Sequence, residues 1–162
     1  FRTRALTIGV AGGQVHIMDP NGGTSHFVWR DPQHVFAFAW HPSHGERFYL
    51  FKDRSHEVTV IGKDAMPANG HNTYLPHTDN AWVLNDTYPQ GPQKLQRPYI
   101  YHIPTNRRIE VGAFPTIAAI NGTEWRCDTH PSASRSGRQF CFDSAHAGGR
   151  QVYVADIGRL LD

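Results

Sequence analysis

The chain has 162 residues, of which 39% are hydrophobic and 19% are charged, with a net charge of +2 and eleven histidines. This composition excludes an intrinsically disordered chain, and the length is sufficient for one domain with its own core. No apolar run approaches the roughly 20 residues of a membrane-spanning helix. The net charge excludes no class of partner, and we expect neither a membrane nor a nucleic acid as a partner.

Short runs rich in β-branched and aromatic residues recur along the chain, and glycine, proline and asparagine separate them. In chain order the runs are residues 5–10, 14–18, 26–29, 35–40, 47–51, 57–61, 82–86, 98–103, 107–111, 138–142 and 151–157. This pattern is typical of strands, whereas almost nothing has the periodicity of a helix. The sequence predicts an all-β fold.

A repeat underlies these runs. His26, His71 and His130 each begin a tetrapeptide that leads into a turn and then into an apolar strand. Four short strands per unit of about 45 residues are typical of a β-propeller blade. We predict a β-propeller of four-stranded antiparallel blades, with a β-sandwich as the alternative.

The repeat divides the chain into one partial propeller domain over residues 1–162. We assign residues 1–20 to the outer strands of one blade, 24–63 and 70–112 to two blades, and 124–157 to an incomplete last blade, with surplus loops at 87–96 and 114–124. A ring needs roughly 4 to 8 blades, so about three and a half would leave it open. We expect the remaining half in the same longer chain or in another chain.

The start of the chain supports this interpretation. There is no initiator methionine, and the first residues already have a strand pattern. We expect an N-terminally truncated chain from a cytoplasmic or periplasmic protein.

The repeat also predicts a site. Equivalent positions in successive blades are related by rotation about the propeller axis, so His26, His71 and His130 should project from matching first strands into one space. Asp128 lies two residues before His130, and in an extended strand both side chains share a face. A set of two histidines and an aspartate suits manganese, iron or zinc. Arg126, and secondarily Arg4, are candidates for binding a carboxylate.

A simpler interpretation stays open for each of these residues. A histidine in a strand is commonly a half-buried residue that is hydrogen-bonded to backbone. Asp86 and Asp143 end equivalent strands, and we interpret them as turn residues.

Two resemblances sharpen these expectations. Residues 130–157 are similar to the WD40-like repeat of TolB-type propellers. The sequences GH at 70–71, NDTYP at 85–89 and RCDTHP at 126–131 resemble, in this order, the C-terminal half of oligogalacturonate lyases and their uncharacterised relatives. This second resemblance covers nearly the whole chain.

The resemblance implies a seven-bladed propeller with a divalent metal, typically manganese. It implies cleavage of short uronate oligomers by β-elimination, as in pectin degradation, with a histidine as the base. By position, His26 falls at the base, and His71 and His130 match two metal ligands. The family's last ligand motif is Gln-x-x-His-x-His, and here Trp125 and Asp128 stand where that glutamine and the first of those histidines would be.

Two functions follow as hypotheses. The first is a metal-assisted carbon–oxygen lyase that acts on oligogalacturonides or related acidic oligosaccharides. The second is a non-catalytic propeller that binds sugars or proteins, which the replaced ligands favour. A third, the propeller half of a hydrolase, lacks a nucleophile elbow in these residues. Fold alone does not decide among them.

Overall fold

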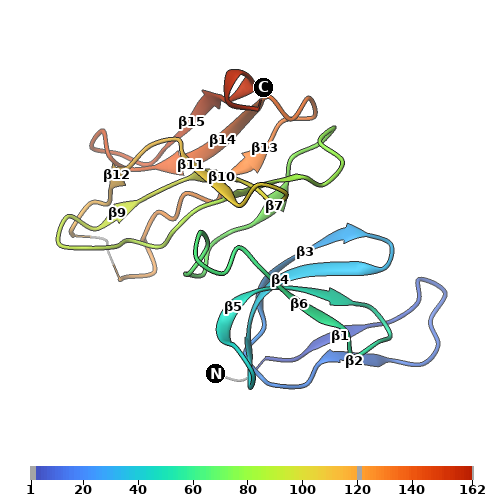
Figure 1. Cartoon of the computed structure of the whole chain (residues 1–162). Coiled ribbons are helices and arrows are strands. Elements are labelled where there is room, and N and C mark those ends of the chain that lie inside the picture. The colour runs from blue at the N-terminus through green and yellow to red at the C-terminus, as the bar shows by residue number, and fades with distance from the viewer. Residues whose placement is uncertain (1–2, 120–121, 162) are drawn as a thin grey trace. The chain divides into compact units, whose positions relative to one another are not determined.

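The computed structural model describes residues 3–119 and 122–161, and it is built almost entirely of β-strands (Figure 1). Every ladder between named strands is antiparallel. In these ranges the one helix is a short 3₁₀ turn, η1 (Gly158–Leu160). No helix there has the length and apolar character needed to cross a membrane. The all-β prediction is confirmed. The chain forms two compact units, residues 1–69 and 70–162.

The first unit contains two sheets. Strands β1 (Ala5–Thr7) and β2 (His16–Asp19) form a two-stranded sheet. Four strands form the larger sheet, in chain order β3 (Ser25–Asp31), β4 (His34–His41), β5 (Gly45–Lys52) and β6 (Val58–Ile61). Because each strand pairs with the next along the chain, short connections are enough to build the larger sheet.

Strand β4 explains how the first unit is held together. Its residues Val35, Ala37 and Ala39 pack with Met18 of β2 and with side chains of β5. On the opposite face of β4, the Phe36 ring lies 5.2 Å from that of Phe48, and both rings are fully buried. Burial of both faces accounts for a run that is apolar at successive positions rather than alternating.

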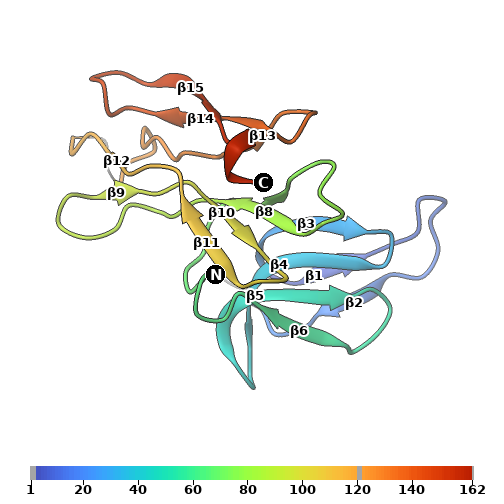
Figure 2. The same cartoon turned by 45° about the horizontal axis from the view of Figure 1, so that its top comes forward.

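The second unit contains three sheets, of which the two larger ones pack on each other. The first has β7 (Thr73–Tyr74), β8 (Trp82–Asn85), β10 (Tyr99–His102) and β11 (Arg107–Glu110) in that order. The second has β13 (Ser132–Ala133), β14 (Gln139–Ser144) and β15 (Gln151–Asp156). Figure 2 shows the second sheet lying over the first. Leu84 and Ile100 of one sheet and Phe140 and Phe142 of the other share one core cluster.

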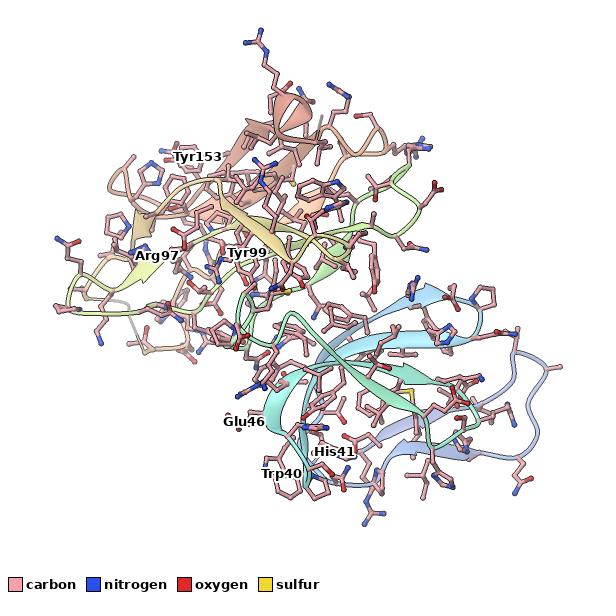
Figure 3. All side chains as sticks on the ribbon, viewed as in Figure 1. Trp40, His41, Glu46, Arg97, Tyr99 and Tyr153 are labelled. Atoms are coloured by element: carbon pink, nitrogen blue, oxygen red, sulfur yellow. The ribbon has the colours of Figure 1, made fainter. Side chains whose placement is uncertain are left out.

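A buried tyrosine stiffens the sheet that supports the site. Tyr99 is labelled in Figure 3. Its hydroxyl accepts a hydrogen bond from Asn85 Nδ2 at 2.6 Å, and the Arg108 guanidinium carbon lies 3.7 Å from the centre of the tyrosine ring. Burial raises the pKa of Tyr99 strongly, so its hydroxyl stays protonated. These contacts fix the end of β8, which leads directly to Asp86.

The two surplus loops of the sequence carry structure that was not predicted. Strand β9 (Leu95–Gln96) comes from the first loop and β12 (Phe114–Pro115) from the second, and the two pair antiparallel. Part of the second loop, residues 120 and 121, lies outside the described residues. The pairing joins residues nearly 20 positions apart, so local sequence patterns do not reveal it.

Candidate metal centre

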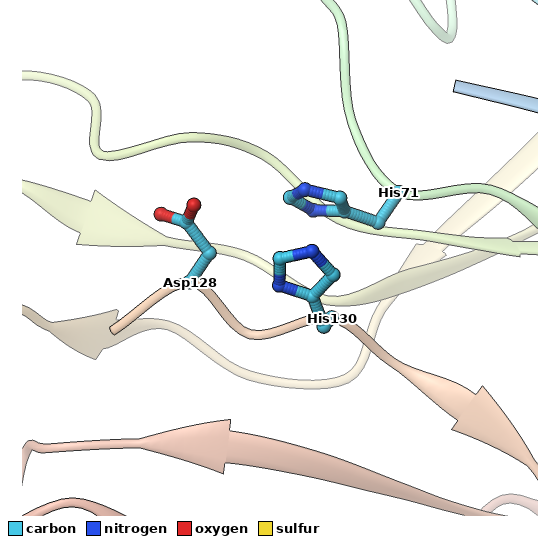
Figure 4. A group of neighbouring side chains, drawn as sticks. All are labelled: His71, Asp128 and His130. Carbon is cyan, nitrogen blue, oxygen red and sulfur yellow. The ribbon is translucent and has the colours of Figure 1, made fainter. Parts of the chain in front are cut away.

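Two loops of the second unit bring three potential metal ligands together. His71, Asp128 and His130 each offer one ligand atom, and these atoms all lie within 4.8 Å of one another (Figure 4). The ring centres of His71 and His130 are 3.6 Å apart, with 32° between the ring planes. The structure therefore brings together the three residues that the sequence predicts as ligands.

The backbone reaches this arrangement differently from the prediction. His26 lies in β3, the first strand of its sheet, but His71 and His130 come two residues before β7 and β13. Asp128 and His130 are therefore not neighbours in an extended strand. His130 instead has a φ of 37°, in the left-handed region that side chains other than glycine rarely adopt. Strain of this kind persists where the surrounding structure fixes it, commonly at functional sites.

Asp86 contacts both the backbone and the ring of His71. One Asp86 carboxylate oxygen accepts from the His71 backbone amide at 2.7 Å, and both oxygens lie 3.0 Å from His71 Nδ1. The Thr129 hydroxyl also donates to Asp86. Asp86 is fully buried and lies outside any turn, so its interpretation as a turn residue is wrong. Burial alone raises the pKa of Asp86, but its hydrogen bonds to His71 and Thr129 hold that pKa below its usual range.

Asp128 has one satisfied and one unsatisfied oxygen. Its Oδ2 accepts from Arg126 Nε at 2.8 Å, whereas Oδ1 is buried and has no hydrogen-bond partner. A buried carboxylate oxygen without a partner costs free energy that a bound cation would recover. Two imidazole nitrogens and one carboxylate oxygen form a donor set that suits manganese, iron or zinc. The residues present thus fit a divalent metal.

A polar cavity of about 410 Å³ adjoins these ligands. Its lining comprises Thr123, Glu124, Arg126, Asp128, His130, Asp143 and Arg150. Arg150 donates from Nη2 to the backbone carbonyl of Arg126 at 2.8 Å, which ties the two arginines together. The volume is within the usual range for small-molecule sites, and guanidinium groups bind carboxylates well.

His26 belongs to a second cavity, in the first unit. This cavity measures about 550 Å³, and its lining includes His26, Arg4 and Glu46. The structure therefore places the predicted base and one predicted carboxylate-binding arginine on the same hollow. The backbone is irregular at His26: the register of β3 shifts between Ser25 and Phe27, and His26 has a φ of 41°. Bulges of this kind redirect side chains and are frequent near active sites.

The hydrogen bonds of His26 define its tautomer. Its Nδ1 lies 2.7 Å from Ser25 Oγ and 3.1 Å from Asn69 Oδ1. An amide oxygen only accepts, so Nδ1 carries the proton, and in the neutral ring Nε2 carries the lone pair. A neutral imidazole in this state has a nitrogen that can take up a proton.

Sequence reasoning missed Thr129 and Arg150 and misinterpreted Asp86. The structure explains the glycine of the GH sequence, since Gly70 packs directly on the backbone of Asp86. A methyl group at Gly70 would collide with the Asp86 carbonyl oxygen and lie 2.8 Å from Asn85 Oδ1. A glycine is required at this position by the close approach of two backbones.

We therefore expect Gly70→Ala to lower the free energy of unfolding by about 2–3 kcal/mol, because the clash is with backbone that has no room to move. Urea unfolding followed by fluorescence measures this difference. Gly149→Ala is the matched control, since a methyl group there meets nothing within 4 Å. Equal stability of the two variants would contradict the proposed packing of Gly70 on Asp86.

Comparison with known proteins supports the fold. Neither protein-family models nor curated protein sequences match this chain. Among solved structures, TolB from Acinetobacter baumannii has a TM-score of 0.71 at 16% identity, over 96% of this chain and 35% of TolB. An oligogalacturonate lyase in complex with manganese has a TM-score of 0.51 at 16% identity, over 98% of this chain and 55% of that protein.

At this identity the likeness concerns the fold. The chain has the fold of TolB-like propellers, as the repeat and its resemblance predicted. It spans about a third of the length of TolB and about half of the length of the lyase.

Proposed function

We propose that this chain is part of a metal-dependent lyase that cleaves oligogalacturonides or related acidic oligosaccharides by β-elimination. The observation that carries the proposal is the cluster of His71, Asp128 and His130, with its unsatisfied carboxylate oxygen, beside a cavity lined by arginines. The resemblance of the sequence to oligogalacturonate lyases and the manganese complex of a structural neighbour support it.

His71, Asp128 and His130 would hold the divalent metal, which is manganese by analogy with that neighbour. The metal would supply a positive charge that stabilises the negative charge developing on the substrate carboxylate. Arg126 has two functions in this proposal. Its Nε holds Asp128, and its guanidinium lines the cavity, where it would bind a substrate carboxylate.

We assign the proton transfer to His26. Its Nε2 would remove the proton from the carbon next to the substrate carboxylate. The electron pair of that C–H bond then forms a carbon–carbon double bond, and the glycosidic oxygen on the next carbon leaves and takes up a proton. Arg4, on the same cavity as His26, would bind a substrate carboxylate. His26 and Arg4 belong to the first unit, and the metal ligands belong to the second.

We further propose that the complete propeller has seven blades, of which this chain supplies about half. Apolar side chains are exposed on the sheet of β1 and β2, where the exposed fraction is 55% for Leu6 and 48% for Ile17. They are also exposed on β15, where it is 69% for both Val152 and Val154. Further blades, in the same longer chain or in another chain, would cover these surfaces, since soluble proteins rarely leave large apolar patches exposed.

The alternative function is a non-catalytic propeller that binds sugars or proteins. The specific observation in its favour is Trp125, which stands where the resembling family has a glutamine ligand. Trp125 is 70% exposed, and an indole offers no lone pair to a metal. The metal centre therefore has fewer protein ligands than the family pattern.

The full-length protein distinguishes these functions. We expect oligogalacturonate to give products with the ultraviolet absorbance of an unsaturated uronate. We expect this activity to disappear after chelation and to return when manganese is added. Binding of oligogalacturonate without any such product, with manganese present, would contradict the lyase and favour the binding module.

A further inference from the structure

Asp86 contacts both segments that carry the metal ligands. It follows β8 directly, accepts two kinds of hydrogen bond from His71, and accepts a third from the Thr129 hydroxyl. Thr129 stands between Asp128 and His130 in the chain. One fully buried carboxylate thus connects residue 71 with residues 128–130.

We propose that Asp86 is a positioning residue that orients His71 for metal binding and fixes the 128–130 segment through Thr129. This inference rests on the proposed metal centre and assigns to it a supporting carboxylate that the sequence patterns do not identify. Asp86 offers no oxygen to the metal in this proposal. It acts through the residues that do.

The effect on His71 follows from hydrogen-bond chemistry. An ionised carboxylate only accepts, so the His71 Nδ1 that faces Asp86 carries the proton. In the neutral ring the lone pair is then on Nε2, which is the nitrogen that would coordinate the metal. Carboxylate–histidine pairs of this kind fix the ring orientation of metal ligands and raise their basicity.

The effect on the other two ligands runs through Thr129. Its hydroxyl donates to Asp86, and its backbone carbonyl accepts from the Asp143 amide of β14 at 2.9 Å. Thr129 is fully buried, so both hydrogen bonds lie away from water. With Thr129 held from both sides, the residues before and after it have little freedom, which fits the unusual φ of His130.

A purely structural role for Asp86 is the competing explanation, and the chain contains a matched control for it. Asp19 ends β2, is fully buried, and accepts from the Thr24 hydroxyl and from the Asn21 amide at 3.0 Å. It therefore shares with Asp86 the burial, the strand end and the threonine donor. It lacks a histidine partner in these contacts.

Manganese titration of the full-length protein tests the proposal. We expect Asp86→Asn to weaken manganese binding about 10- to 100-fold, because the new amide group no longer dictates the proton position on His71. Thr129→Val should weaken it less. Asp19→Asn should lower stability but leave the manganese affinity unchanged. Wild-type affinity in folded Asp86→Asn, or an equal loss in Asp19→Asn, would overturn the proposal.

A second readout needs neither metal nor a folded variant. Imidazole ¹⁵N chemical shifts of the metal-free wild type should show His71 as the tautomer protonated on Nδ1. A His71 protonated on Nε2 instead would overturn the proposal even if manganese binds. Conversely, absence of manganese binding with the expected tautomer would reject the metal centre while leaving the contact between Asp86 and His71 as described.

Discussion

Replacing His130 by alanine is expected to abolish stoichiometric manganese or zinc in the purified protein. The change leaves one imidazole and one carboxylate, which is too small a donor set to retain a divalent ion through purification. Because the His130 side chain is exposed, its removal should affect stability much less than metal binding. Elemental analysis of the purified variant and wild type measures the difference.

His146→Ala is the control for that experiment. His146 is an exposed histidine of the same unit whose Nδ1 contacts Ser144 Oγ at 2.8 Å, and it is absent from the ligand cluster. We expect full metal content in this variant. Metal content in His130→Ala equal to that of His146→Ala would reject His130 as a ligand.

Replacing His26 by alanine is expected to lower turnover on oligogalacturonate by ~10²-fold or more while manganese content stays unchanged. His26 supplies the proton acceptor in the proposal and has no part in holding the metal. The two measurements are therefore predicted to separate: kcat falls, and the metal remains.

His34→Ala serves as the matched control for His26, because His34 lies in the same sheet and its Nδ1 contacts the Asp31 carboxylate at 2.8 Å. We expect its turnover to stay near that of the wild type. Near-normal turnover in His26→Ala would remove His26 from the mechanism and leave the base unidentified.

The fold was predictable where its signal is local. The short runs of β-branched and aromatic residues and the spacing of three histidines predicted an all-β propeller-like repeat, because strands and turns depend mainly on neighbouring residues. The pairing of β9 with β12 was missed because it depends on contacts between two loops that have no pattern of their own.

The ligands of the candidate site were predictable from the sequence, but the buried carboxylate that holds them was not. His71, Asp128 and His130 were identified from their types and positions, although Asp128 and His130 converge through a left-handed residue and not through an extended strand. Asp86 was misinterpreted because its partners lie 15 and 43 residues away and its burial depends on packing. Side-chain type alone does not distinguish a turn aspartate from a buried one.

Pulsed electron paramagnetic resonance of the manganese-loaded full-length protein tests the central claim most directly, because it detects the nitrogens bound to the ion. The account predicts one manganese per chain with couplings to two imidazole nitrogens, those of His71 and His130, and the loss of one coupling in His130→Ala. Bound manganese without nitrogen couplings, or no bound manganese at all, would contradict it.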